Sequence, residues 1–335
     1  LNNSTEICTN DAFTNIPIRR NYRTNVSGNL LTKQGTINVT IDPEFEQPDL
    51  NDYPELRAAL ANGGSVALSE DVTISAPLVV ESGKTVEIDL NGHDIINTTS
   101  LPDTDPRYGN TTVFEVKGDA TLNIKGDGDV KAIGTNPNED GYRMAVYAYG
   151  DAQVNIYGGN FSNDQDYNNH QAQLDLIYAD QNAVINIYGG TFESKSANDR
   201  GYWVLNLKVG SNAAINVYGG TFVNFDPSNS MTENPVKNFV VATSTTVKVS
   251  EDPQPNGSYE VVPEGGVVSV PIEVNDAESL IEALSNPVVA NIEVASSIDL
   301  SEKSAEELTF EEYKTIDIKE GVTIRLGQTN CLTAE

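Results

Sequence analysis

The chain has 335 residues, of which 20 are Lys or Arg and 49 are Asp or Glu, and its formal net charge is −29. So acidic a surface repels nucleic acid and anionic lipid headgroups, and we therefore predict no nucleic-acid partner. No apolar stretch approaches the ~20 residues that a membrane-spanning helix needs, and no transmembrane segment is expected in this chain.

Residues 1–48 are predicted to form an N-terminal β segment. Two candidate strands, Asn15–Thr24 and Gly35–Ile41, are separated by Ser27 and Gly28, residue types that favour a turn. This segment lacks the repeats of the later sequence, so we expect it to be separate from the part that follows.

A short amphipathic helix is expected next, over Asp52–Ala61. Leu56 and Leu60 are four residues apart and would share one face, and Pro54 suits the first turn of a helix. Stacked repeats need a cap at each end, and this helix precedes the first repeat.

An internal repeat dominates residues 49–252. Asn-Ile or Asn-Val, followed by an aromatic or basic residue and then Gly, begins at Asn123, Asn155, Asn186 and Asn216, in steps of 32, 31 and 30 residues. Apolar residues alternate with polar ones around each Asn, which is typical of a strand with one buried face. The Gly after each strand permits a sharp corner.

One repeat cannot bury its apolar face alone, so successive repeats are predicted to stack in register. Crossovers between parallel strands are nearly always right-handed, which predicts an all-β fold, a right-handed parallel β-helix or solenoid. Ile156, Ile187 and Val217 would then lie in one interior file. Phe161, Phe192 and Phe222 would form a second interior file, and Tyr157, Tyr188 and Tyr218 an exterior one.

The repeat ends near residue 252. Residues 253–270, rich in Pro, Gly and acidic side chains, are predicted to be a linker or a last coil. Residues 271–335 then repeat the earlier order: a helix beginning at Asn275–Glu278, followed by two strand-like segments. These residues are predicted to begin a second β-helix-like unit or to form a C-terminal cap.

Two segments resemble known surface proteins. Residues 16–32 (IPIRRNYRTNVSGNLLT) and 38–45 (NVTIDPEF) resemble the end of a β-sandwich in fimbrillin-like surface proteins of Bacteroides-type bacteria. The Ile-Tyr-Gly-Gly-Thr-Phe repeats resemble those of β-helical surface proteins of the same bacteria that are described as adhesins. The resemblance implies an extracellular location on the bacterial outer-membrane surface, with a lipoprotein anchor upstream of Leu1. It implies no catalytic residue.

One loop in each repeat falls at the same place, just before the strand that leads to a Gly-Asp turn. The five loops are Thr98–Asn110, Thr135–Tyr142, Ser162–Ala172, Ser194–Gly201 and Asp226–Lys237. In a stacked solenoid they would line one edge. The candidate ligand-binding residues in and beside them are Asp105, Arg107, Tyr108, Asp140, Tyr142, Arg143, Asp164, Asp166, Tyr167, His170, Asp199, Arg200, Tyr202 and Trp203.

Carboxylates, guanidinium groups and aromatic rings together suit sugars, because rings stack on apolar sugar faces and planar polar groups bond hydroxyls. The sequence therefore predicts a non-catalytic, adhesin-like protein that binds a carbohydrate or a host surface or matrix ligand along this edge. The simpler explanation is that Asp, Gly and Tyr are ordinary loop residues and that Arg pairs locally with Asp.

Two other functions stay open. A β-helical polysaccharide lyase or glycoside hydrolase would need paired carboxylates, and Asp164, Asp166 and Asp175 near His170 are the candidates. A structural spacer would need no site at all. No cofactor is predicted. The alternative is Ca²⁺ at Gly126–Asp129, where a Gly-Asp-Gly-Asp sequence falls short of a complete calcium-loop pattern.

Overall fold

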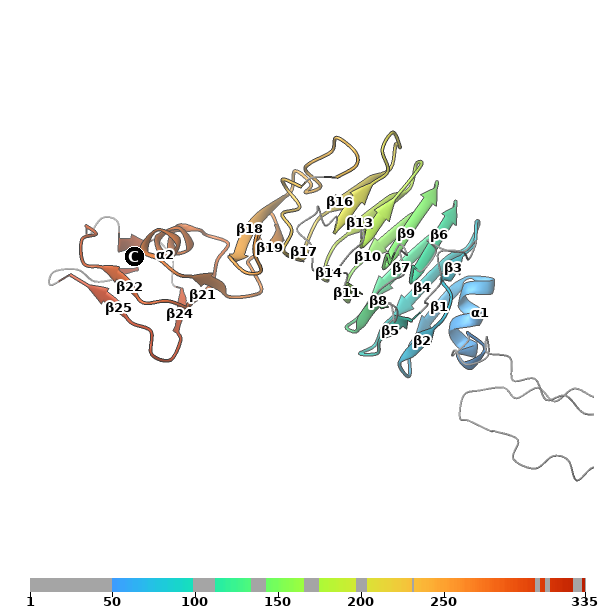
Figure 1. The fold of residues 1–335 in the computed structure, drawn as a ribbon, viewed down its shortest axis with the longest axis horizontal. Coiled ribbons are helices and arrows are strands. Elements are labelled where there is room, and N and C mark those ends of the chain that lie inside the picture. Colours follow the sequence, from blue (N-terminus) through green and yellow to red (C-terminus); the bar gives the residue numbers. More distant parts are fainter. Residues whose placement is uncertain are drawn as a thin grey trace, which may run out of the picture.

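The computed structural model describes residues 50–98, 112–133, 143–165, 175–196, 204–230, 232–304, 308–310, 314–327 and 333–334. It is mainly β, and most of its strands pair in parallel (Figure 1). The predicted all-β class is therefore confirmed. Residues 1–48, the predicted N-terminal segment, lie outside the described residues.

Three parallel sheets make up the larger part of the molecule. The first sheet contains, in spatial order, β1 (Gly64–Ala67), β4 (Thr85–Asp89), β7 (Thr121–Lys125), β10 (Gln153–Ile156), β13 (Val184–Ile187) and β16 (Ala214–Val217). The second contains β2 (Val72–Ile74), β5 (Ile95–Asn97), β8 (Asp129–Ile133), β11 (Asn160–Gln165), β14 (Thr191–Ser196) and β17 (Gly220–Val223). The third contains β3 (Leu78–Val80), β6 (Phe114–Gly118), β9 (Val146–Gly150), β12 (Ile177–Ala179) and β15 (Leu205–Leu207).

Three successive strands of the chain belong to three different sheets, and the next strand belongs again to the same sheet as the first of the three. Thus β6, β7 and β8 belong to the third, first and second sheets, and β9 pairs with β6. We call each such set of three strands a layer. The backbone hydrogen bonds of the sheets run between layers, so one layer cannot be stable without its neighbours.

The predicted register is confirmed by the strand pairing. Asn155 pairs with Asn123 and Asn186, and Asn186 pairs with Asn216. Their side-chain amides form a continuous ladder, with hydrogen bonds of 2.8, 2.9 and 3.0 Å. Each amide in this ladder donates to the layer before it, which fixes the alignment of the layers.

The core lies between the three sheets. Ile156, Ile187 and Val217 are fully buried in one file, as predicted. The rings of Phe161, Phe192 and Phe222 stack in a second file, with centroids 5.1 Å apart. On the outside, Tyr157, Tyr188 and Tyr218 stack with centroids 4.9 and 4.8 Å apart, also as predicted.

Glycine is required at the corners between the first and second sheets. Gly190 has a φ of +103°, and a Cβ atom there would lie 2.7 Å from the carbonyl oxygen of Gly159. Only glycine combines this backbone conformation with so close an approach of two layers.

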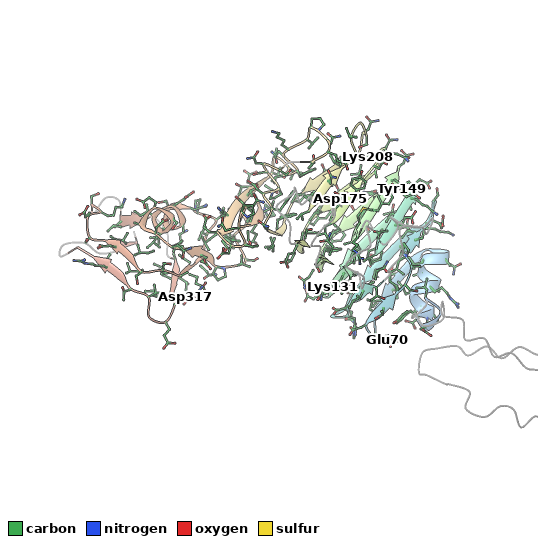
Figure 2. All side chains as sticks on the ribbon, in the orientation of Figure 1. Glu70, Lys131, Tyr149, Asp175, Lys208 and Asp317 are labelled. Atoms are coloured by element: carbon green, nitrogen blue, oxygen red, sulfur yellow. The ribbon has the colours of Figure 1, made fainter. Side chains whose placement is uncertain are left out.

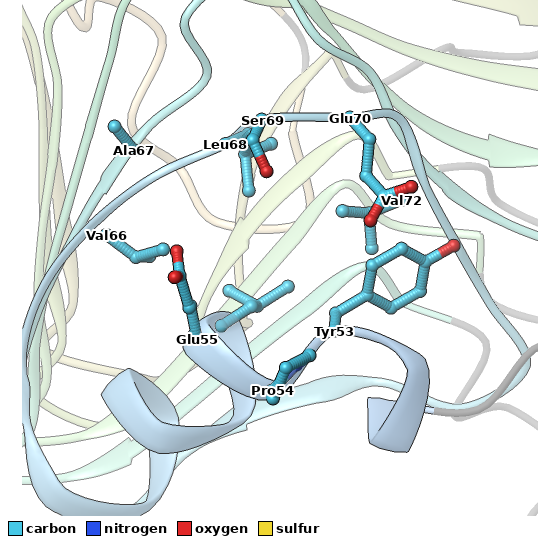
Figure 3. A pocket seen from close by; sticks show the side chains of 10 residues that line it. Tyr53, Pro54, Glu55, Val66, Ala67, Leu68, Ser69, Glu70 and Val72 are labelled. Carbon is cyan, nitrogen blue, oxygen red and sulfur yellow. The ribbon is translucent and has the colours of Figure 1, made fainter.

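Helix α1 (Pro54–Asn62) covers the first layer, after a short 3₁₀ turn at Leu50–Asp52. Leu56, Ala59 and Leu60 are buried against the core, which confirms the predicted cap. Between α1 and the segment Val66–Val72 lies a cavity of about 170 Å³, into which the Tyr53 ring projects (Figure 3).

At the other end of the second sheet the strand direction reverses. Strand β19 (Ser258–Pro263) pairs antiparallel with β17 and with β18 (Ser244–Ser250). Val240 still pairs in parallel with Val217 of β16. Residues 253–270, predicted to be a linker or a last coil, instead contain the antiparallel strand β19. The connection between β18 and β19 is too short for a parallel crossover, which needs about a dozen residues or more.

The remaining elements form a second unit, whose apolar core also includes Val247 and Val249 of β18 and Val262 of β19. They are β20 (Ile272–Val274), α2 (Ala277–Ser285), β21 (Asn291–Val294), β22 (Ile298–Leu300), β23 (Thr309–Phe310), β24 (Thr315–Ile318), β25 (Ile324–Leu326) and β26 (Thr333–Ala334). Asp276 and Ser279 form a capping box that starts α2. No helix of the described residues is both long and apolar enough to cross a membrane.

Candidate functional site: the outer face of the third sheet

Four of the five predicted loops leave the second sheet and return to the third sheet along one edge. The fifth, Asp226–Lys237, follows β17, and the chain then pairs at Val240 with Val217 of the first sheet. Strands β5, β8, β11 and β14 are in register where the chain leaves, and β6, β9, β12 and β15 are in register where it returns. The loops start later than predicted at two places, because β11 extends to Gln165 and β14 extends to Ser196.

Most of the predicted site residues lie in these loops, outside the described part of the chain. They are Asp105, Arg107, Tyr108, Asp140, Tyr142, Asp166, Tyr167, His170, Asp199, Arg200, Tyr202 and Trp203. The backbone of Asp164 is placed in β11, in register with Lys195 of β14.

Arg143 does not belong to an exposed edge, contrary to the prediction. Its side chain is buried, and its carbonyl oxygen accepts a hydrogen bond from the side-chain amide of Asn163 over 3.2 Å. The residues that follow, Met144 and Ala145, are also buried. The chain has thus already entered the interior at Arg143, and the guanidinium group cannot meet a ligand from solvent.

The described residues beside this edge instead bring tyrosines together on the outer face of the third sheet. Glu115, Tyr147, Tyr178 and Asn206 occupy one outward file, from β6 to β15. Tyr147 stacks with Tyr149 at a centroid distance of 5.0 Å and lies 5.7 Å from Tyr178. The sequence does contain a signal for this pair, because Val-Tyr-Ala-Tyr at the start of β9 alternates with a period of two and so places both tyrosines on one face.

A hydrogen bond holds the Tyr149 ring in place. The Tyr149 hydroxyl donates to Glu115 over 2.8 Å. Burial, followed by this bond to Glu115, raises the pKa of Tyr149, and burial likewise raises the pKa of Tyr178. Both phenols therefore stay protonated at neutral pH, and the Tyr149 proton is donated to Glu115.

Asp175 is the buried carboxyl group of the site. It precedes β12, is 2% exposed and accepts a hydrogen bond from the Asn206 side chain over 2.8 Å. Burial raises its pKa to about 8, against the opposing effect of the Asn206 hydrogen bond, and the negative charge of Glu233 raises it further. Asp175 is therefore mainly protonated at neutral pH.

Residues 232–237 lie over the last strand of this sheet, β15. The backbone N–H of Glu233 donates to the side-chain oxygen of Asn206 over 3.0 Å, and the Asn234 amide donates to the carbonyl of Lys208 over 3.3 Å. Tyr178 is only 7% exposed, whereas Tyr147 and Tyr149 are partly exposed. The accessible part of the face is therefore the Tyr147–Tyr149 pair.

Figure 2 shows Tyr149, Asp175 and Lys208 on the same side of the stacked sheets. Two partly exposed rings can stack on an apolar surface, and the partly exposed carboxylate of Glu115 beside them can accept hydrogen bonds from hydroxyl groups at its rim.

Within the part of the chain that the structure describes, no group of three or more His, Cys, Asp or Glu is placed to hold a metal ion. Of the candidate calcium sequence Gly126–Asp129, Asp129 forms an ion pair with Lys131 and accepts a hydrogen bond from Asn160. Contacts with these two side chains thus explain the position of Asp129 without a metal ion.

The comparisons with known proteins bear on the first part of the chain. A family model described as a family of unknown function (DUF6562) matches residues 1–88. This match runs from the N-terminal segment through α1 and into β4, and so crosses the domain boundary predicted at residues 48 and 49. No curated protein and no solved structure matches the chain.

Proposed function

We propose that the chain winds as a right-handed parallel β-helix and that it is a non-catalytic, adhesin-like protein of a bacterial cell surface. Its ligand would be a glycan or another host surface or matrix ligand, bound where the loops meet the third sheet. The winding is supported by the order of strands among the three sheets and by the general preference for right-handed crossovers.

One observation carries the binding proposal: the Tyr147–Tyr149 pair is partly exposed and lies beside the loop edge. These stacked rings present a rigid apolar surface. Strand pairing fixes their backbone, and the hydrogen bond to Glu115 fixes the Tyr149 ring. Such a surface binds a sugar ring with little loss of side-chain entropy.

The charge of the chain favours a neutral ligand. With a net charge of −29, the protein repels polyanions such as sulfated or uronic-acid-rich chains at low salt. We therefore expect neutral glycans to bind better than acidic ones.

A glycan array, combined with a screen for released reducing ends, tests this function. The protein should bind a subset of neutral glycans without forming products, and the double variant Tyr147→Ala/Tyr149→Ala should lose this binding. Tyr157→Ala is the matched control, because Tyr157 is also a stacked, exposed tyrosine but lies on a different face. Equal binding by all three proteins would refute the site.

A second function, a β-helical polysaccharide lyase or glycoside hydrolase, is favoured by one observation. Asp175 has the raised pKa that a general acid needs, and Glu233 is near enough to influence it. Against this, Asp175 is almost completely buried and already bonded to Asn206. Product release by the intact protein that is abolished in Asp175→Asn would establish the enzyme instead. If the protein neither binds nor cleaves glycans, the remaining function is that of a structural spacer.

A further inference from the structure

The cavity beside helix α1 lies at the N-terminal end of the main stack, next to the segment that joins β1 to β2. Its volume is about 170 Å³, which is room for about one large side chain. The apolar part of its wall consists mainly of four side chains that are otherwise buried in the core: Leu56, Val66, Leu68 and Val72. This wall suits the apolar part of a side chain from outside the stack.

Two carboxylates and an aromatic ring stand at the rim of this cavity. Figure 3 shows the Glu55 side chain on one side, and the Tyr53 ring and the Glu70 side chain on the other. Both glutamates are exposed, and neither forms an ion pair with a described residue. Glu55 suits the first turn of a helix, where a negative charge compensates the helix dipole, but this reason does not apply to Glu70.

A hydrogen bond fixes the Tyr53 ring at the cavity. The Tyr53 hydroxyl accepts this bond from the backbone N–H of Thr73 over 3.0 Å. Thr73 belongs to β2, the last strand of the second sheet at this end, and the N–H of the neighbouring Val72 donates to Asp94 of the next layer. The Thr73 N–H therefore faces the end of the stack, where the Tyr53 hydroxyl replaces the carbonyl group of a further layer.

These features favour a side chain with an apolar stem and a planar positive charge. An arginine can bury its methylene groups against the apolar wall, donate hydrogen bonds to the carboxylates at the rim and stack on the Tyr53 ring. A neutral side chain would leave the carboxylates without a partner, and an acidic one would be repelled. A lysine has the charge but not the planar group that stacks on a ring.

The sequence that precedes the cavity contains a cluster of arginines. Arg19, Arg20 and Arg23 are three of the eight arginines of the chain and lie within five positions. Residues 50–72, around the cavity, include four acidic residues and one basic residue, so the two segments attract each other. The 26 residues between Arg23 and Leu50 are long enough to bring the cluster back to the cavity, because an extended chain spans ~3.3 Å per residue.

The family match supports this pairing of segment and cavity. The matched residues 1–88 contain the three arginines and every residue that lines the cavity, so both belong to one family unit. We propose that an arginine of residues 19–23 inserts into the cavity and docks the N-terminal segment on the end of the stack. Helix α1 packs against β1 and β3, and the docked segment would extend this cover toward β2. The proposal is independent of the glycan site, which lies on the third sheet.

Limited digestion of the folded full chain with trypsin tests the proposal, because an arginine seated in the cavity cannot enter the protease. In Glu55→Gln/Glu70→Gln, cleavage after at least one of the three arginines should be about tenfold faster than in the wild type, as expected when a charge-assisted hydrogen bond is lost. Cleavage after Lys33 should not change. Glu264→Gln/Glu320→Gln is the matched control, because it removes two exposed carboxylates that lie outside the cavity, and all four rates should stay as in the wild type.

Hydrogen exchange of the Thr73 amide gives a second measurement, because this amide is bonded to the Tyr53 hydroxyl at the cavity. The amide should exchange faster in the double glutamate variant and in Arg19→Gln/Arg20→Gln/Arg23→Gln. Combining the two sets of substitutions should give no further increase, since both remove the same contact.

Three results would overturn the proposal. Cleavage after the three arginines could be equally fast in the wild type and in the double glutamate variant, or cleavage after Lys33 could rise as much as cleavage after the arginines. Protection of the arginines could instead grow with protein concentration, which would assign the cavity to an arginine of another copy.

Discussion

The side-chain amide of Asn206 donates a hydrogen bond to Oδ1 of Asp175 over 2.8 Å, while its oxygen accepts one from the backbone N–H of Glu233 over 3.0 Å. One side chain thus joins a buried carboxyl group on one layer to a segment that folds back from the end of the stack. The protonation state of Asp175 therefore affects the stability of the region that Asp175, Asn206 and Glu233 form together.

Asp175 should make the protein less stable as the pH rises. Its pKa in the folded protein, about 8, lies above the ordinary value of 3.8, so the folded state binds more protons than the unfolded state between these values. Its contribution is complete below 3.8 and is lost as the pH rises through about 8, with a slope of up to ~1.4 kcal/mol per pH unit.

The variant Asp175→Asn removes this titration and keeps the shape of the side chain. Thermal midpoints of the variant and the wild type, compared across that pH window, should diverge as the pH rises, with the wild type falling further. Parallel curves would show that Asp175 does not titrate in this range.

Phe192→Ala should destabilise the protein far more than Tyr188→Ala. Phe192 is completely buried between two other rings, so its loss leaves a cavity and should cost about 3–5 kcal/mol. Tyr188 stacks in the same manner but is 41% exposed, and its loss should cost about 1 kcal/mol. Thermal melts showing the reverse order would mean that the faces of these strands are inverted.

Asn186→Ala should interrupt the amide ladder. Asn186 donates to Asn155 and accepts from Asn216, so its removal leaves a donor and an acceptor in neighbouring layers without their partners. We expect a loss of about 1–3 kcal/mol in the free energy of unfolding. Asn212→Ala, at the exposed end of a similar row, removes a 3.2 Å bond to Asn182 and should change stability little.

Gly190→Ala should be worse tolerated than Gly210→Ala. Both positions have positive φ, so an alanine at Gly210, which has open space around it, should cost about 1–2 kcal/mol. At Gly190 the new Cβ would also clash with the backbone of the adjacent layer. Expression yield and melting temperature of the two variants compare backbone strain alone, at Gly210, with strain plus a steric clash, at Gly190. Equal losses of stability would contradict the close approach of the layers.

The sequence was sufficient to predict the strands, their buried faces and their register. Asn, Gly and Phe recur at fixed positions of the repeat, and stacking places equivalent positions of successive repeats side by side. It was not sufficient where the chain departs from the repeat. The reversal at β18 and β19 depends on a short connection, and no residue in it specifies the direction of pairing.

The candidate site shows the same limit. The outward tyrosines of β9 follow from alternation, but the surroundings of Asp175 include Asn206, which is bonded to Glu233, far along the chain. Arg143 is of a residue type that suits a ligand, yet its place at the entry to a strand buries it. Residue type alone does not distinguish a loop residue from the first buried residue after the loop.

The differing steps of the Asn ladder have a consequence for how such a chain can change in length. Although the steps are 32, 31 and 30 residues, the paired strands stay aligned, so length differences are accommodated between strands and not within them. Deleting one complete period would place Asn186 on Asn123, shorten the protein by about 4.8 Å and keep every side chain on its own face. Deleting a single residue within a strand would instead exchange inside and outside from that point to the end of the strand.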